Sequence, residues 1–233
     1  MGENLNQPPS VAIIIVTFND PANLSRCLTS LKKELIGQAL RCHLTVVDNS
    51  TDDSAKKNIA QLVKRVKQAV YIDPKTNTGF ARGNNIALKQ EFDQGTDYCF
   101  LLNSDTELFK GSIAELVETQ IKTNSALVGP TLVYGDRPQI YWYGGGRWQP
   151  YLGIVRHLGR NELVRPQSAQ AVTFINGAAL LIPKATYLKY GGFFEPYFMY
   201  YEDSDYSAQL VRAGEQLYYE PRVVIKHYVP AVT

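Results

Sequence analysis

The stretch VAIIIVT, from Val11 to Thr17, is a continuous apolar run rich in β-branched side chains. Such a run is typical of a strand that is buried on both faces, as in a parallel sheet. Asp20 and Pro21 then predict a helix start, because aspartate caps a helix and proline suits its first position. Apolar residues follow at helical spacing, at Leu24, Cys27, Leu28 and Leu31. The chain therefore opens with a buried strand and an amphipathic helix.

The same alternation continues along the first half of the chain. Apolar runs predict further strands at 43–47, 69–72 and 98–102, and helical periodicity predicts helices near 59–66 and 84–92. Strands that alternate with helices indicate a parallel sheet covered on both faces.

Polar residues stand where three of these strands end. Ligands of such sheets bind outside the carboxyl ends of the strands. Asp, Asn and Ser are also common turn formers, which is the alternative interpretation of each single site. Three apolar strands ending in the same way favour a binding site, made of Thr17-Phe18-Asn19, Asp48-Asn49-Ser50 and Asn103-Ser104-Asp105.

The second half is less regular. Periodicity fails over 134–170, a segment rich in aromatic residues and glycine that fits either a hairpin or a long loop. A strand at 177–182, a short helix near 184–189 and a last helix at 202–213 follow, with Gly214 as the stop of the last helix.

Length and composition limit the protein class. The chain has 233 residues, 45% of them hydrophobic, which suits one α/β domain. Its formal net charge of +2 is too balanced to indicate a nucleic-acid partner. Cys27, Cys42 and Cys99 show no paired spacing and predict free thiols in a reducing compartment. No run reaches the ~18 apolar residues of a bilayer span, and the polar start is unlike a signal peptide. A cytoplasmic protein is expected, with peripheral contact with the inner membrane surface left open.

Three stretches carry candidate chemistry. The segment 77–85, NTGFARGNN, holds two glycines that let the backbone approach a phosphate, and Arg82 could pair with it. It matches neither the Walker nor the dinucleotide pattern, and an ordinary turn is the alternative. Asp105 ends an apolar strand, where a carboxylate can hold Mg²⁺ or Mn²⁺ together with substrate phosphates. A capping aspartate is the alternative there.

The third stretch is acidic. Glu202, Asp203 and Asp205 lie at a predicted helix start among aromatic residues. Crowded carboxylates raise at least one pKa, which suits a general base; a solvated first turn is the alternative. His227 follows an apolar strand. It is either a structural residue or a ligand of a metal or diphosphate that is contributed from near the end of the chain.

Taken together, these pieces resemble the family 2 glycosyltransferases of the GT-A fold, and in particular their bacterial rhamnosyltransferase-like branch. The resemblance covers roughly residues 11–227. It rests on the order of VTFN (16–19), VDNS (47–50), NTGFARGNN (77–85), LNSD (102–105), GGFFE (191–195), MYYEDSD (199–205) and the final histidine.

The resemblance implies an α/β fold of GT-A type, with a Rossmann-like, mostly parallel central sheet flanked by helices and a small acceptor-side lobe. One domain is expected over 1–233, with 10–133 as the nucleotide-sugar-binding half and 134–233 as the acceptor-binding and catalytic half. The implied activity is metal-dependent, inverting transfer of a sugar from a nucleotide-diphosphate sugar, dTDP-rhamnose or a UDP-sugar, to a saccharide or lipid-linked saccharide. Bacterial surface polysaccharide synthesis is the implied process.

The resemblance also implies residue roles. Asp48 reads the imide N–H of uracil or thymine, and the other nucleotide-sugar contacts are Thr17, Asn19, Asn77, Gly79, Arg82, Asn84, Asn103 and Ser104. Asp105 and His227 hold Mn²⁺ or Mg²⁺. Asp203 is the catalytic base, and the acceptor side is supported by Glu202, Asp205, Trp142 and Trp148. The two tryptophans could equally pack a small lobe.

Two departures from the family pattern stand out: Asn103 replaces the first aspartate of the DXD-type motif, and the chain ends soon after His227. Two rival functions stay open. A nucleotidyltransferase would usually place a glycine- and arginine-rich loop after the first strand, where TFNDP (17–21) stands instead. A non-catalytic nucleotide- or sugar-binding pseudoenzyme is disfavoured by the presence of both Asp105 and Asp203.

Overall fold

The first half of the chain alternates strands and helices as predicted. In the computed structural model, which describes residues 7–35, 40–149, 151–165 and 167–229, this half contains β1 (Ser10–Thr17), α1 (Pro21–Leu35), β2 (Arg41–Asp48), α2 (Asp53–Lys64), β3 (Val70–Ile72), α3 (Gly79–Asp93) and β4 (Tyr98–Leu102). β1 pairs in parallel with both β2 and β4, and β2 pairs in parallel with β3. The prediction of a parallel sheet is confirmed for this half.

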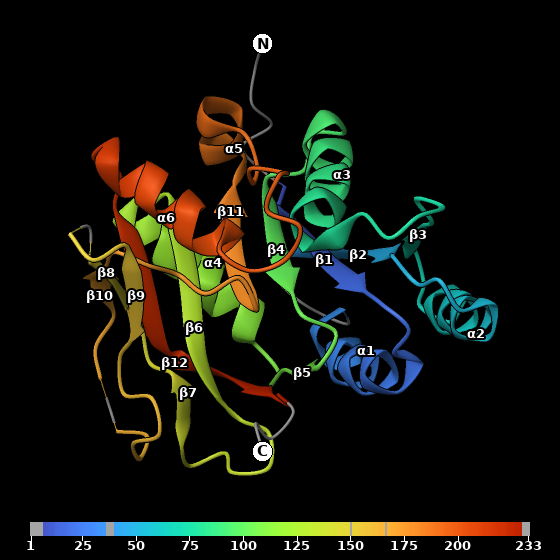
Figure 1. The fold of residues 1–233 in the computed structure, drawn as a ribbon, viewed down its shortest axis with the longest axis horizontal. Helices are drawn as coiled ribbons and strands as arrows, with labels where there is room; N and C mark the ends of the chain where they lie inside the picture. Colours follow the sequence, from blue (N-terminus) through green and yellow to red (C-terminus); the bar gives the residue numbers. More distant parts are fainter. Residues whose placement is uncertain (1–6, 36–39, 150, 166, 230–233) are drawn as a thin grey trace.

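The second half adds strands of mixed direction. It contains β5 (Thr106–Glu107), α4 (Ser112–Thr123), β6 (Leu127–Tyr134), β7 (Tyr141–Tyr143), β8 (Gly146–Gln149), β9 (Ile154–His157), β10 (Gln170–Val172), β11 (Ala179–Pro183), α5 (Lys184–Tyr190), α6 (Glu202–Arg212) and β12 (Leu217–His227). Within the described ranges, ten strands form one sheet in the order β10-β12-β6-β11-β4-β1-β2-β3, with β5 on β12 and β7 on β6 (Figure 1). A single sheet therefore runs through both predicted halves.

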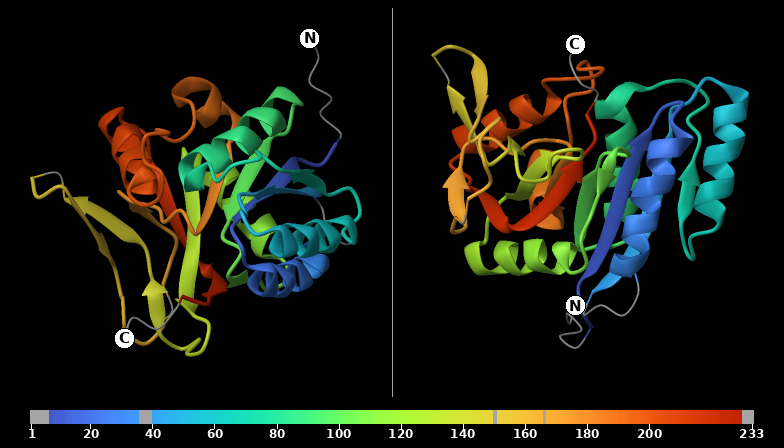
Figure 2. Two further views of the ribbon diagram at one scale, coloured as in Figure 1. Left: turned by 45° about the vertical axis from the view of Figure 1, so that its right-hand side comes forward. Right: turned by 90° about the horizontal axis from the view of Figure 1, so that it is seen from below.

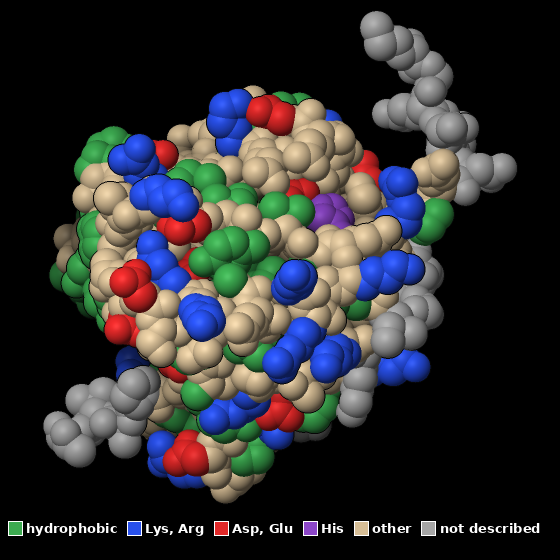
Figure 3. All heavy atoms as spheres, turned by 90° about the vertical axis from the view of Figure 1, so that its right-hand side faces the viewer, with side chains coloured by type: hydrophobic (Ala, Val, Ile, Leu, Met, Phe, Trp, Pro, Cys, Tyr) green, Lys and Arg blue, Asp and Glu red, His purple; other side chains and the backbone are tan. Residues whose placement is uncertain are grey.

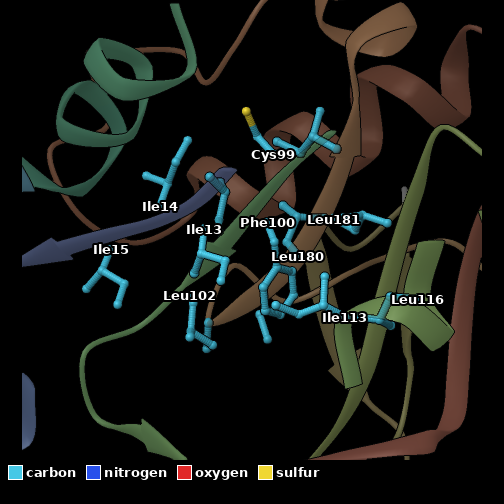
Figure 4. Close-up of a cluster of buried hydrophobic side chains, with 14 of the residues drawn as sticks. Ile13, Ile14, Ile15, Cys99, Phe100, Leu102, Ile113, Leu116, Leu180 and Leu181 are labelled. Atoms are coloured by element: carbon cyan, nitrogen blue, oxygen red, sulfur yellow. The ribbon is translucent and has the colours of Figure 1, made fainter. Parts of the chain in front are cut away.

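Helices cover both faces of the sheet (Figure 2). α1 and α4 lie on one face, and α3 and α6 lie on the other. The core between them is formed by β1, β4, β11 and α4 (Figure 4). Ile13, Phe100 and Leu181 are fully buried there, and burying each such side chain contributes roughly 1.5–3 kcal/mol. The carboxyl ends of β1 and β4 are thus fixed to a rigid platform.

Two strands contain proline; β6 is absent from the predicted elements, and only the apolar stretch of β12 before His227 is predicted. β6 carries Pro130, and the first half of β12 ends near Pro221. Proline cannot donate to a ladder and normally argues against a central strand. The pairing of β6 with β12 is irregular after Pro130 and Glu220, which is where the ladder tolerates these residues.

Two other boundaries differ from the predictions. α3 begins at Gly79, so most of the glycine-containing stretch is the first turns of a helix. The irregular segment 134–170 contains a true hairpin, in which β8 pairs antiparallel with β9, and this resolves the alternative left open. The hairpin forms a small lobe beside the main sheet (Figure 2).

Candidate active site

Two adjoining cavities lie at the carboxyl ends of β1 and β4. The first, of about 270 Å³, is lined by Val16, Thr17, Phe18, Asp20, Asn49, Asn77, Gly79, Phe80, Asn103, Ser104, Asp105, Phe198 and Met199. The second, of about 340 Å³, is lined by Phe80, Asn103, Asp105, Trp142, Asn176, Gly177, Ala178, Met199, Tyr200, Glu202, Asp203, His227 and Val229. They share a wall that includes Asn103 and Asp105.

Buried polar atoms without a hydrogen-bond partner gather on these walls. Seven such side-chain atoms occur in the described part of the chain, and five belong to cavity-lining residues. Buried polar groups are nearly always paired in folded proteins, so such a group usually faces a ligand, an ion or water. The five atoms are Thr17 Oγ1, Asn103 Oδ1, Asp105 Oδ1, Glu202 Oε2 and His227 Nδ1.

Asp105 and His227 meet although 121 residues separate them in the sequence. The cause is the short strand β5, which pairs antiparallel with the end of β12 and sets His227 opposite Thr106. Asp105 precedes that strand, and its carbonyl accepts a hydrogen bond from Tyr228 N at 2.8 Å. His227 Nε2 then lies 3.2 Å from Asp105 Oδ1. The predicted pair is therefore brought together.

The pair fits a divalent cation. Two neighbouring ligands of an octahedral ion with bonds of 2.0–2.1 Å are about 3 Å apart, which matches the separation of these two atoms. Asp105 Oδ1 forms no hydrogen bond, and the ring nitrogen of His227 that does not face it, Nδ1, is also without a hydrogen-bond partner. Within the described residues no group of three or more His, Cys, Asp or Glu side chains could hold a metal. A cation held here would complete its coordination with substrate oxygens or water.

The second cavity has two carboxylates at the start of α6. Asp203 Oδ2 accepts from Gly177 N at 2.9 Å, and Oδ1 accepts from Ser204 Oγ at 3.2 Å. Burial raises the pKa of Asp203, while these hydrogen bonds act in the opposite direction. Burial also raises the pKa of Glu202 to about 7, with the charge of Asp203 adding to the rise. The cavity can therefore hold a proton acceptor that titrates near neutral pH.

The segment 193–201 closes over the first cavity and meets the start of α3. Phe80 N donates to the carbonyl of Phe198 at 2.7 Å. Gly79 has φ of +75°, and a Cβ there would overlap that carbonyl oxygen and the Phe198 ring. Glycine is therefore required at this position for two independent reasons, backbone conformation and close approach.

Four predicted nucleotide contacts do not line either cavity. Asp48 is fully buried and accepts from Ser50 N and the Tyr71 hydroxyl, so it faces the protein interior. Asn19 accepts from the amides of Thr51 and Asp52. These two predicted contacts serve to hold the loop after β2.

The other two are on α3. Because the helix already begins at Gly79, Arg82 lies on its outer surface, 3.8 Å from a carboxylate oxygen of Glu195 and with 62% of its side chain exposed. Asn84 is buried and donates to the carbonyl of Phe80. In this geometry Arg82 lies outside both cavities, and its phosphate contact stays a prediction.

Trp148 and Asp205 line a separate cavity of about 500 Å³ between the β8–β9 hairpin and α6. Arg212 stacks over the Trp148 ring at 4.5 Å. Trp142 lies instead in the second main cavity, where its ring stands perpendicular to His227 at 4.5 Å between centroids. The two predicted aromatic positions therefore serve different sites.

The sequence analysis places Asn49 in the expected binding site without a role of its own, and it misses several other wall residues. Asn49 orders the turn before α3, accepting from Thr78 N and donating to the carbonyl of Gly79. Asn176 and Gly177 form a turn before β11, and Gly177 orients Asp203. The Asn-Gly pair at 176–177 is a turn signal that could have been used. Phe198 and Met199 carry no such signal, because only the path of the segment over α3 makes them cavity walls.

Comparison with known proteins identifies the family of this fold. The family model described as glycosyl transferase family 2 matches residues 12–181. The dTDP-rhamnosyl transferase RfbF of Shigella flexneri is 23% identical over 226 residues, covering 94% of this chain and 69% of that protein. The N-acetylglucosaminyl-diphospho-decaprenol L-rhamnosyltransferase of Mycobacterium tuberculosis is 25% identical over 240 residues, covering 93% of this chain and 75% of that protein.

Solved structures show the same fold at lower identity. GalNAc-T7 in complex with UDP, GalNAc and Mn²⁺ superposes with a TM-score of 0.76 at 15% identity, over 98% of this chain and 44% of that one. The mannosyltransferase PcManGT from Pyrobaculum calidifontis with GDP-Man and Mn²⁺ gives 0.69 at 14%, over 97% of this chain and 59% of that one. This chain thus spans about half the length of these two structures. The expected GT-A fold is confirmed, and the chain belongs to glycosyl transferase family 2.

Proposed function

We propose that this glycosyltransferase is a metal-dependent, inverting enzyme that moves a sugar from a nucleotide-diphosphate sugar to a hydroxyl of a saccharide or lipid-linked saccharide. dTDP-rhamnose is the first candidate donor, followed by UDP-sugars, and bacterial surface polysaccharide synthesis on the cytoplasmic side of the membrane is the proposed process. The observation that carries the proposal is the position of Asp105 on the wall between two cavities, with Asp203 inside the second. The names of the two rhamnosyltransferase relatives support the donor.

The donor is assigned to the first cavity and the acceptor to the second. Thr17, Asn77, Gly79, Asn103 and Ser104 line the space proposed for the nucleotide and its diphosphate. Trp142, which lines the second cavity, is proposed to contact the acceptor sugar. Trp148 and Asp205, in the cavity beside the hairpin, are proposed to contact the next sugar of a longer acceptor. This assignment divides the work between the halves 10–133 and 134–233.

Asp48 is the least direct of the proposed contacts. To read the imide N–H of uracil or thymine, its carboxylate has to exchange the Tyr71 hydroxyl, now at 2.7 Å, for the base. Such an exchange keeps the buried carboxylate hydrogen-bonded throughout. Cytosine and the purines lack that donor in this position, since cytosine and adenine have no ring N–H there and the ring N–H of guanine lies elsewhere relative to the ribose. They would leave the carboxylate unpaired, which gives selectivity.

The transfer is a single displacement. The acceptor oxygen attacks the anomeric carbon as the bond to the diphosphate breaks, and the hydroxyl proton passes to Asp203. Asp105 and His227 would hold a divalent cation, which would supply positive charge to the departing diphosphate. The Asp203 carboxylate is held in a fixed orientation by hydrogen bonds from Gly177 N and Ser204 Oγ. General-base help contributes roughly 10²–10⁴-fold, and charge stabilisation of a leaving group is usually the larger part.

Calorimetric titration of nucleoside diphosphates tests the donor site. UDP or dTDP is expected to bind with Mn²⁺ or Mg²⁺ much more tightly than CDP or GDP, and EDTA or Asp105→Ala should weaken binding sharply. Asp48→Ala should remove the base preference while leaving the cation requirement. Equal binding of all four nucleotides, with or without cation, would refute the donor assignment.

The chemistry is tested on the product. NMR of its anomeric coupling should show a configuration opposite to that of the donor, because one displacement inverts the carbon. Retention would exclude the single displacement. A chain that binds UDP with Mn²⁺ yet neither transfers nor hydrolyses any donor would be the pseudoenzyme.

A further inference from the structure

The β8–β9 hairpin ends in large apolar side chains that contact little of the protein. Tyr151 is 100% exposed, Leu152 68% and Ile154 51%. Singly exposed apolar residues are common, but contiguous ones usually mark an interaction site. The hairpin projects from the body of the molecule, so its tip is free to meet a surface (Figure 2).

The same hairpin places two arginines directly opposite each other. Arg147 pairs with Arg156 across the antiparallel ladder, and both are exposed. Like charges at such a position are destabilising. Neither guanidinium forms an ion pair within the residues that the structure describes. The sequence from 140 to 165 contains four arginines and one glutamate, a net +3 in a chain whose total is +2.

A second exposed apolar strip lies beside the hairpin. Ile154 and Tyr201 line the same 500 Å³ cavity, which joins the hairpin to the segment before α6. That segment exposes Phe198, Met199, Tyr200 and Tyr201 by 51–72% each. Exposed apolar side chains thus stand on both sides of this cavity, on the hairpin and on the segment that borders the cavity containing Asp203.

We propose that the β8–β9 hairpin docks this protein on an anionic lipid bilayer, with Tyr151, Leu152 and Ile154 inserted and Arg147 and Arg156 on the lipid headgroups. Interfacial binding of this kind combines buried apolar area with attraction to anionic lipid. Tyrosine is one of the two residues enriched at the membrane–water boundary. Docking in this orientation brings the acceptor-side cavity to the lipid surface. The proposal is independent of the proposed transfer reaction, because it is measured without donor or acceptor.

Charge alone would favour a different face. Residues 53–75 contain six lysines and arginines and two aspartates, a net +4. Figure 3 shows basic side chains spread over this α2 side of the molecule. However, none of the large exposed apolar side chains in the described ranges comes from 53–75. That face can attract an anionic surface, but it offers nothing to insert, whereas the hairpin offers both.

Co-sedimentation with lipid vesicles distinguishes the two faces. The full chain is expected to bind vesicles of phosphatidylglycerol and phosphatidylcholine, to bind pure phosphatidylcholine much less, and to dissociate as salt rises. Arg147→Gln with Arg156→Gln should lower the partition coefficient by roughly 25-fold, about fivefold for each arginine near the surface. Tyr151→Ser with Leu152→Ser should lower it by roughly tenfold or more. The matched control, Lys57→Gln with Lys64→Gln on α2, removes the same charge and should retain binding.

The melting temperatures of the variants show whether weaker vesicle binding is caused by unfolding. Removing the Arg147–Arg156 repulsion should leave the melting temperature equal to or above that of the wild type, so weaker vesicle binding cannot be explained by unfolding. No binding by the wild type, or loss in the α2 control rather than in the hairpin variants, would overturn the proposal. Self-association abolished by the tip variant, with no vesicle binding, would show instead that the hairpin contacts a second copy.

Discussion

Asp203 and Glu202 are adjacent carboxylates whose surroundings give them different abilities. Asp203→Asn should keep the shape of the site and most of its hydrogen bonds but cannot accept a proton. We expect donor affinity near that of the wild type and kcat lower by roughly 10²-fold or more. Glu202→Gln should be milder, although Glu202 Oε2 is unpartnered. Single-turnover kinetics with both variants measures this.

The opposite ranking would reassign the base. A larger fall in kcat for Glu202→Gln than for Asp203→Asn would make Glu202 the proton acceptor. Asp205→Asn is the matched control, because Asp205 lines the cavity beside the hairpin and should act through acceptor KM alone.

The raised pKa of Glu202 also predicts a pH effect on stability. Its folded pKa of about 7 lies above the value of 4.5 expected when exposed, so the folded state retains a proton that the unfolded state loses. The stabilisation that this proton gives the folded state is complete below pH 4.5 and is lost as the pH rises towards 7. His157, whose pKa burial lowers to about 4, acts in the opposite direction between about 4 and 6.5.

The comparison of wild type with Glu202→Gln isolates the glutamate. Between pH 4.5 and 7, the free energy of unfolding should fall less steeply with rising pH in Glu202→Gln than in the wild type, or rise more steeply. Urea denaturation at a series of pH values gives the slopes. Parallel curves for the two proteins would show that Glu202 titrates normally.

Individual residues mark the limit of what the sequence predicts. Asp105, Asp203, Trp142 and His227 were named in advance, and the structure brings all four to one cavity. Arg82 and Asp48 were named on the same grounds but point elsewhere. A motif fixes which residues stand near a strand end, whereas the direction of a side chain depends on partners such as Tyr71 and Glu195.

At the scale of elements, the start of α3 and the segment 193–201 depend on each other. Gly79→Ala adds a methyl group where the Phe198 carbonyl lies and forces φ of +75° on alanine. We expect a loss of about 1–2 kcal/mol from the left-handed backbone alone and a further loss from displacing the segment. UDP binding should weaken as well, because Phe198 and Met199 line the first cavity. Thermal unfolding and titration give the two effects.

Gly95→Ala provides the matched control. Gly95 has φ of +93° but no atom within 4 Å of an added Cβ, so it suffers the backbone strain without the overlap. It should lose stability without losing UDP affinity. If both variants bind UDP equally well, the contact between Gly79 and Phe198 has no part in forming the donor cavity.

Elements with regular patterns are predicted from the sequence, whereas β6 is not predicted and β12 is predicted only over 223–225. β1 and α1 are local, amphipathic or fully apolar segments whose period survives in the sequence. β6 and β12 contain prolines that the sheet accepts only because their pairing is irregular, a property of two strands about ninety residues apart. The antiparallel direction of β11 is likewise set by its neighbours.

At the scale of the whole molecule, the alternating pattern predicted an α/β sheet, and the structure confirms it. The predicted boundary near residue 134 does not interrupt the sheet, since β6 and β12 lie side by side across it. None of the helices in the described ranges has the length and apolar character to cross a bilayer.

The meeting of β5 with β12 has a consequence for how the enzyme matures. Strands β1 to β4 can pair early in synthesis, since their parallel ladder needs nothing from later residues. β12 enters the sheet between β10 and β6, and only then does His227 reach Asp105. Contacts between residues far apart in the sequence form late in folding. The entropy cost of closing the long loop between them must be met before the contact stabilises the fold. If Asp105 and His227 hold a cation as proposed, that site is therefore incomplete in the nascent chain until β12 has joined the sheet.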